Sequence, residues 1–202
     1  PTWVPFCREL WSSAEQQQNY LPGVPEGSDL CITPVSAPEN HYVRIKADNR
    51  LDADGTLRGT FTLTAEGQSD SNIRRIFTTG FRSEWKNTME SQLLAISPKA
   101  KLLSVDYGKN PKDYQAAPIK ITFRYEIPDY ALKGEKEMFF RPLVMNNLYN
   151  QVRSYLRIDT SLEERKYGFK DGCSRLVELD ETIQLPAGYK LANADKNETM
   201  QG

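Results

Sequence analysis

The sequence predicts a mainly β fold of the α+β class: an antiparallel β-sandwich with one long or broken helix, preceded by an irregular N-terminal extension. Three observations predict it. Apolar and polar residues alternate in several stretches between residues 41 and 185, which is the period of a half-buried strand. In one stretch, near residues 70–96, apolar residues instead recur three and four positions apart, which is the period of a helix. Residues 1–40 show neither period.

The N-terminal extension divides into two parts. Residues 1–15 carry Trp3, Phe6 and Trp11 but are too short to form a core, so we expect them to pack on another body. Residues 16–40 begin QQQNYLPGVPEGSDLCITP, where Pro restricts the backbone and Gly permits reversals. This composition predicts a turn-rich connector that is neither helix nor strand. The second domain, residues 41–202, is then the sandwich.

The elements of the sandwich follow from the period of each stretch. Alternation around Val43–Lys46 and over Leu57–Ala65, with Asp54-Gly55 between, predicts a β-hairpin. Further strands are expected at residues 101–107, 119–127, 138–140, 156–158 and 177–185. The last of these is closed by a turn at 186–188.

The helical segment has predicted ends and a predicted break. Ser69, Asp70 or Ser71 is expected to cap its N-terminus, and Ser97-Pro98 to end it. Gly80 in its middle predicts a kink or a division into two shorter helices.

Composition excludes several classes of function. The chain has 202 residues, 39% of them hydrophobic, which suffices for a core. Its net charge of −1 offers no electrostatic attraction to nucleic acid or anionic lipid. No apolar run approaches the ~20 residues of a transmembrane helix.

The cysteines and the single histidine predict no catalytic or metal site. Cys7, Cys31 and Cys173 are odd in number and lack CxxC spacing, and zinc would need four ligands. We expect small buried thiols, with a Cys7–Cys31 disulfide left open. A Cys-His or Ser-His arrangement would have to use His41, which is expected to be a surface or turn histidine.

Acid pairs and tyrosines are the remaining candidates. Asp52/Asp54 and Glu163/Glu164 lack any further pattern of glycoside or calcium chemistry, and a hairpin turn explains the first pair better. Exposed tyrosines would suit a sugar-stacking platform, although packing at strand ends is favoured. The tyrosines concerned are Tyr107, Tyr114, Tyr125 and Tyr130. We therefore predict no catalytic, cofactor-binding or metal-binding residue in this chain.

The chain begins with Pro1-Thr2, and Tyr20–Gly27 follows after the aromatic stretch. This order resembles the end of the papain-like core of a bacterial transglutaminase-like protein and the stretch that leaves that core, so the chain resembles the C-terminal part of such a protein. The remainder resembles the β-rich domain of unknown function that follows such a core. That likeness rests on Gly55–Gly59, Glu66-Gly67 ahead of Asn72–Arg75, Ser161–Tyr167 and Thr182–Tyr189, a strand ending in Leu-Pro-x-Gly-Tyr.

The resemblance implies a role without catalysis. The nucleophilic Cys, the His and the Asp would lie upstream, the Asp directly before Pro1, and none of Cys7, Cys31, Cys173 or His41 would correspond to them. We expect a non-catalytic accessory domain of a periplasmic or cell-envelope protease-like protein, whose partner is the upstream core of the same polypeptide or a peptide or glycan. The alternative is an independent carbohydrate- or peptide-binding β-sandwich module.

Overall fold

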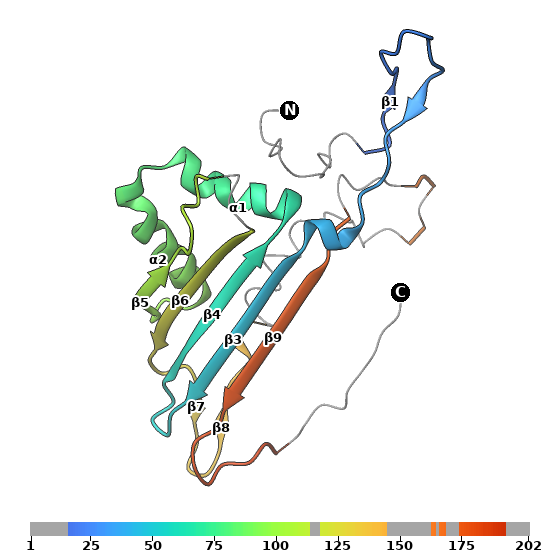
Figure 1. The fold of residues 1–202 in the computed structure, drawn as a ribbon. Coiled ribbons are helices and arrows are strands. Elements are labelled where there is room, and N and C mark those ends of the chain that lie inside the picture. The colour runs from blue at the N-terminus through green and yellow to red at the C-terminus, as the bar shows by residue number, and fades with distance from the viewer. Residues whose placement is uncertain (1–15, 114–117, 145–162, 165, 169–173, 193–202) are drawn as a thin grey trace.

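The computed structural model describes residues 16–113, 118–144, 163–164, 166–168 and 174–192. Within them, one five-stranded sheet has the strand order β5-β6-β4-β3-β9, and two short strand pairs form separate ribbons (Figure 1). The strands of the sheet are β3 (Val43–Leu51), β4 (Leu57–Ala65), β5 (Lys101–Asp106), β6 (Ile119–Ile127) and β9 (Val177–Gln184). The mainly β, α+β class expected from the sequence is confirmed.

The alternation of residue types gives the sheet one apolar and one polar face. On β3, every second residue from Val43 to Leu51 is buried and the residues between are exposed. β3 and β4 form the predicted hairpin, with Leu51 opposite Leu57 and a turn at Asp52–Thr56. β6 pairs with β4 along its whole length, and Phe123 stacks on Phe61 with ring centroids 4.4 Å apart.

The expected antiparallel sandwich needs two corrections: the main sheet is mixed, and in the described residues helices, not a second large sheet, pack on it. β9 runs parallel to β3, with Val43 opposite Val177 and Arg50 opposite Gln184. Alternation tells which face a side chain occupies but not the direction of a strand, so the sequence pattern could not distinguish the two pairings. In the described residues, two helices cover part of the apolar face, and the fully buried Leu143 and Val144 cover another part of it.

The helical segment is divided in two, as the break at Gly80 predicts. Helix α1 (Gly67–Thr79) ends at Gly80, and after a short 3₁₀ turn, η3 (Arg82–Glu84), helix α2 (Trp85–Ile96) follows. Phe77 of α1 and Trp85 of α2 meet edge to face, with centroids 5.1 Å apart. The predicted caps at Ser69, Asp70 or Ser71 are wrong, because α1 begins earlier and its N-cap, Glu66, makes no side-chain cap.

Residues 16–40 are more regular than a connector. β1 (Asn19–Tyr20) pairs antiparallel with β2 (Cys31–Ile32), and a 3₁₀ turn, η2 (Pro38–His41), leads into β3. The expectation of neither strand nor helix is therefore wrong here. The sequence pattern could not predict β1 and β2, because a strand of two residues is too short to show alternation.

A second ribbon lies at the other end of the sheet. β7 (Leu132–Lys133) pairs with β8 (Met138–Phe139), and the Ala131 amide donates to the Gly55 carbonyl of the β3–β4 turn at 3.0 Å. The predicted strand at 156–158 and the aromatic residues of 1–15 lie outside the described residues.

Candidate functional site

The ribbon of β1 and β2 forms an arm that projects from the body of the domain (Figure 1). We call residues Gln16–Val35 the arm. Backbone bonds cross its base, from the Gln17 amide to the Thr33 carbonyl (3.0 Å) and from the Thr33 amide to the Gln18 carbonyl (2.9 Å). The Thr33 hydroxyl also accepts from the Gln18 amide at 2.9 Å. These bonds hold the two sides of the arm together.

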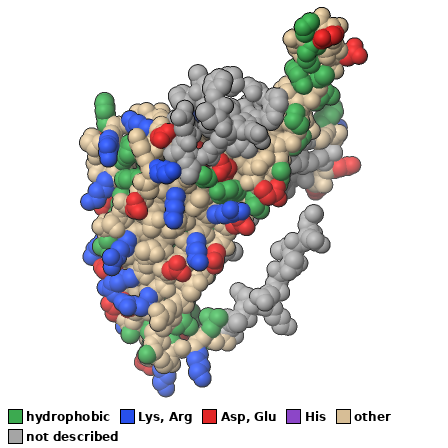
Figure 2. All heavy atoms as spheres, viewed as in Figure 1, with side chains coloured by type: hydrophobic (Ala, Val, Ile, Leu, Met, Phe, Trp, Pro, Cys, Tyr) green, Lys and Arg blue, Asp and Glu red, His purple; other side chains and the backbone are tan. Residues whose placement is uncertain are grey.

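The arm exposes apolar side chains. Leu21, Leu30 and Ile32 are 65–67% exposed. Tyr20, Val24 and Val35 are also exposed, and the arm contains no Lys or Arg. Its only charges, Glu26 and Asp29, lie in the reversal between the strands, and Figure 2 shows acidic atoms beside hydrophobic ones at the end of the arm. An exposed apolar group of this kind is typical of an interaction site.

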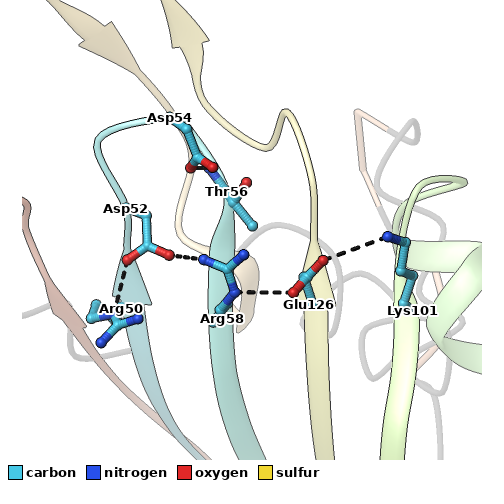
Figure 3. Close-up of polar contacts among 7 residues, drawn as sticks. All are labelled: Arg50, Asp52, Asp54, Thr56, Arg58, Lys101 and Glu126. Carbon is cyan, nitrogen blue, oxygen red and sulfur yellow. Dashed lines mark hydrogen bonds and ion pairs between the residues drawn. The ribbon is translucent and has the colours of Figure 1, made fainter.

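The acid pair Asp52/Asp54 belongs to the hairpin turn, as the sequence favoured (Figure 3). The Asp54 carboxylate accepts from the Thr56 amide at 2.9 Å, and this bond lowers the Asp54 pKa. Asp52 bridges Arg50 and Arg58 instead of facing Asp54. The second pair, Glu163 and Glu164, is exposed. Neither pair forms the two-carboxylate centre of a glycosidase.

Asp52 begins a row of ion pairs across the polar face of the sheet (Figure 3). Arg58 links Asp52 to Glu126, whose carboxylate accepts from the Arg58 Nε at 3.0 Å and also lies 3.5 Å from the Lys101 Nζ. The bond from Arg58 is the main cause of a lowered Glu126 pKa. All four strands concerned contribute to one solvated face, where such pairs add little stability each.

His41 is a buried structural residue. It lies in the η2 turn, as expected of a turn histidine, but it is only 1% exposed, so the surface alternative is wrong. Its Nδ1 accepts from the Gln68 amide at 3.0 Å, and its carbonyl accepts from the Ser69 hydroxyl at 2.8 Å. His41 thus caps α1 from outside the helix. Burial, with Arg175 as a second cause, lowers its pKa and favours the neutral ring that can accept this bond.

No described thiol lies in a catalytic arrangement. Cys31 is a free, half-buried thiol on the arm, with its Sγ 3.5 Å from the Asp29 carbonyl oxygen. Cys7 and Cys173 lie outside the described residues. Among the residues that the structure describes, no three His, Cys, Asp or Glu side chains gather as metal ligands.

The candidate sugar platform is not formed by the tyrosines that are described. Tyr125 is fully buried, and Tyr107 and Tyr130 are half-buried against the core. Tyr107 meets Phe77 and Trp85 edge to face at 5.7 and 5.5 Å. Burial raises the pKa of Tyr125, Tyr130 and Tyr107. Tyr114 lies outside the described residues.

A buried polar network on the apolar face was missed by the sequence reasoning. The Glu181 carboxylate of β9 accepts from the Asn49 side chain (2.8 Å) and from the Leu143 (3.0 Å) and Val144 (2.8 Å) amides. The Tyr125 hydroxyl donates to the other end of the Asn49 amide. The available signal was a charged residue, Glu181, at an apolar position of the alternation in β9.

A second buried network ties α1 to the sheet. The Arg74 Nε donates to Asp70 at 2.7 Å, and Arg74 also donates to the Pro111 and Asp113 carbonyls at 3.0 and 2.8 Å. Asp70 in turn accepts from the Ile119 amide at 2.7 Å. Asp70 and Arg74 make these hydrogen bonds within the fold, so this ion pair has a structural role.

A cavity of about 170 Å³ lies between the apolar face of the sheet and the two helices. Residues of β3, β4 and β6 form one wall, and residues of α1 and α2 form the other. The cavity could not be predicted from the sequence, because its apolar lining residues follow the same pattern as the residues of a core.

Comparisons of the chain with protein-family models, with curated proteins and with solved structures found no match. Among the described residues, no helix is both long and apolar enough to cross a membrane. The assignment of a role therefore depends on the arm, the buried networks and the cavity.

Proposed function

We propose that this chain is a non-catalytic accessory domain of a bacterial, cell-envelope transglutaminase-like protein, and that it docks on the upstream core of that protein through the arm. One observation carries the proposal: the arm presents six exposed apolar side chains on a backbone held in place by its own hydrogen bonds. Leaving such side chains in water is unfavourable, and burial in an interface removes that cost.

The position and charge of the arm support the core as its partner. The arm follows directly on residues 1–15, which the family resemblance assigns to the end of the core, so the two surfaces would be close in the chain. Because the arm has no Lys or Arg, attraction to phosphate or anionic lipid contributes nothing to its binding. An apolar protein surface suits it best.

The buried networks support the absence of catalysis. His41, the only histidine of the chain, uses Nδ1 to cap α1, and the Asp52/Asp54 pair is occupied by the hairpin turn. Tyr107, Tyr125 and Tyr130 pack into the core, which removes the support that they would give to a carbohydrate-binding alternative.

Docking is tested by titrating the 202-residue chain with the upstream core expressed as a separate polypeptide. We expect the Leu21→Asp/Leu30→Asp/Ile32→Asp variant to bind at least tenfold more weakly, since three apolar contacts become charged. Leu132→Asp is the matched control, because Leu132 is 73% exposed on β7, away from the arm, and should bind as the wild type. Equal binding by the triple variant would contradict the proposal.

Catalysis is tested by incubating the chain with glutamine and peptide amide substrates and following ammonia release and acyl transfer. We expect no turnover. Turnover that is lost in the Cys7→Ala or Cys173→Ala variant would refute the non-catalytic assignment while leaving the docking result to stand on its own.

A further inference from the structure

The cavity between the sheet and the helices has an apolar floor. Its most deeply buried lining residues are at most 5% exposed, namely Ile45, Phe61, Phe77, Met89, Leu93, Ile121 and Phe123. At about 170 Å³ it is close in volume to the roughly 150 Å³ apolar cavities that admit benzene. It can therefore take an apolar group of about six carbon atoms.

The less buried residues that line the cavity include apolar side chains, such as Ile76, and three polar ones, of which Arg175 is positively charged. Asn72 is half-buried, Gln92 is exposed, and the guanidinium-bearing Arg175 is half-buried. The described lining residues include no Asp or Glu. Ser69, in the first turn of the thirteen-residue helix α1, also lines the cavity.

The residues of α1 that line the cavity show the direction in which it is elongated. Residues of α1 that line it extend from Ser69 to Phe77, which is about 12 Å along a helix at 1.5 Å per residue. The polar residues Ser69 and Asn72 come first along this line, and the apolar Ile76 and Phe77 come last. An elongated ligand with a polar head and an apolar tail matches this order.

We propose that this cavity binds a short, linear aliphatic carboxylate, with its alkyl chain against the sheet and its carboxylate beside Arg175. The guanidinium group is a strong donor to carboxylates. Removal of each methylene from water favours binding until the cavity is full. This proposal is independent of the arm and of the family resemblance.

The test is a titration of the whole chain with butanoate, hexanoate, octanoate and decanoate, with affinities measured by NMR chemical shifts. Affinity should rise about fourfold per added methylene up to hexanoate or octanoate and then level off. Hexanol and hexylamine should bind at least about tenfold more weakly than hexanoate, because they lack the anionic head.

Two tryptophan variants on the same helix locate the site. Ile96 is half-buried and lines the cavity, so Ile96→Trp should fill it and weaken hexanoate binding at least about tenfold. Leu94 is 42% exposed and is not a lining residue, so Leu94→Trp should leave the affinity within about twofold of the wild type. Arg175→Gln should remove most of the preference for hexanoate over hexanol.

The proposal is overturned if hexanoate does not bind, if affinity rises without limit to decanoate, or if hexylamine binds as tightly as hexanoate. If Ile96→Trp does not fold, methyl-labelled wild-type protein decides instead. Nuclear Overhauser contacts from hexanoate to the Ile73 and Ile76 methyl groups are expected, and contacts confined to residues outside the cavity would contradict the assignment.

Discussion

Gly59 shows how one residue permits the buried network of the sheet. It stands between Asn49 and Tyr125 in the registers of β3–β4 and β4–β6. A Cβ atom there would lie 2.0 Å from the Asn49 Oδ1 and 2.6 Å from the Asp48 carbonyl oxygen. The absence of a side chain lets Asn49 reach Tyr125 across β4, and so connects Tyr125 to Glu181.

We therefore expect Gly59→Ala to lower the free energy of unfolding by about 2–4 kcal/mol, because Asn49 must move and its buried partners lose their bonds. Urea unfolding measures this change. Gly23→Ala is the control: no atom lies within 4 Å of a Cβ built there, so its effect should stay within about 0.5 kcal/mol. A similar small effect at Gly59 would show that the network is not needed.

The lowered pKa of His41 predicts that the stability of the protein depends on pH. Its pKa is lowered in the folded state by burial and by Arg175, so below about pH 6.5 the unfolded chain binds a proton that the folded protein does not. Stability should fall as the pH drops through this range, by at most about 1.4 kcal/mol per unit. No other histidine contributes to this pH dependence, because His41 is the only histidine in the sequence.

Denaturant unfolding between about pH 7.5 and 5.5 tests this prediction. The His41→Gln variant keeps an oxygen that can accept from the Gln68 amide but has no titrating ring, so its stability should not change over the range. A wild-type protein that becomes more stable on acidification would show that the sign is wrong.

At the scale of elements, α1 is held to β6 by Asp70, whose carboxylate accepts from the Ile119 amide and pairs with Arg74 of the same helix. The Asp70 and Arg74 side chains are only 6% and 2% exposed. Removing one member of a buried pair leaves the other charge unpaired, so Asp70→Ala should cost about 3–5 kcal/mol and speed hydrogen exchange at the Ile119 amide. Lys99→Ala removes the exposed pair with Asp129 and should cost less than about 1 kcal/mol. Equal effects of the two variants would contradict the structural role of Asp70.

The elements also show what sequence can predict. The hairpin of β3 and β4, the strand β6 and the break at Gly80 were predicted, because each depends on residues close together in the chain. The cap of α1 was not, because it comes from His41, which is 27 positions before Gln68. The ribbon of the arm was not, because its strands are too short for a period. The parallel pairing of β9 depends on contacts more than 130 residues apart.

At the scale of the whole molecule, the sheet separates two kinds of surface. Its polar face carries the ion pairs around Arg58, whereas its apolar face holds the helices, the buried networks and the cavity. Figure 2 shows Lys, Arg, Asp and Glu side chains distributed over the polar face. The exposed apolar residues of the arm stand apart from both, which is why the arm is assigned to docking and the cavity to a small ligand.

The most direct test of the docking account is hydrogen exchange at the amides of Tyr20, Leu21, Leu30 and Ile32, compared in the 202-residue chain alone and with the upstream core attached. The account predicts that amides among these residues become protected at least about tenfold when the core is present. Unchanged exchange at all four residues would contradict it.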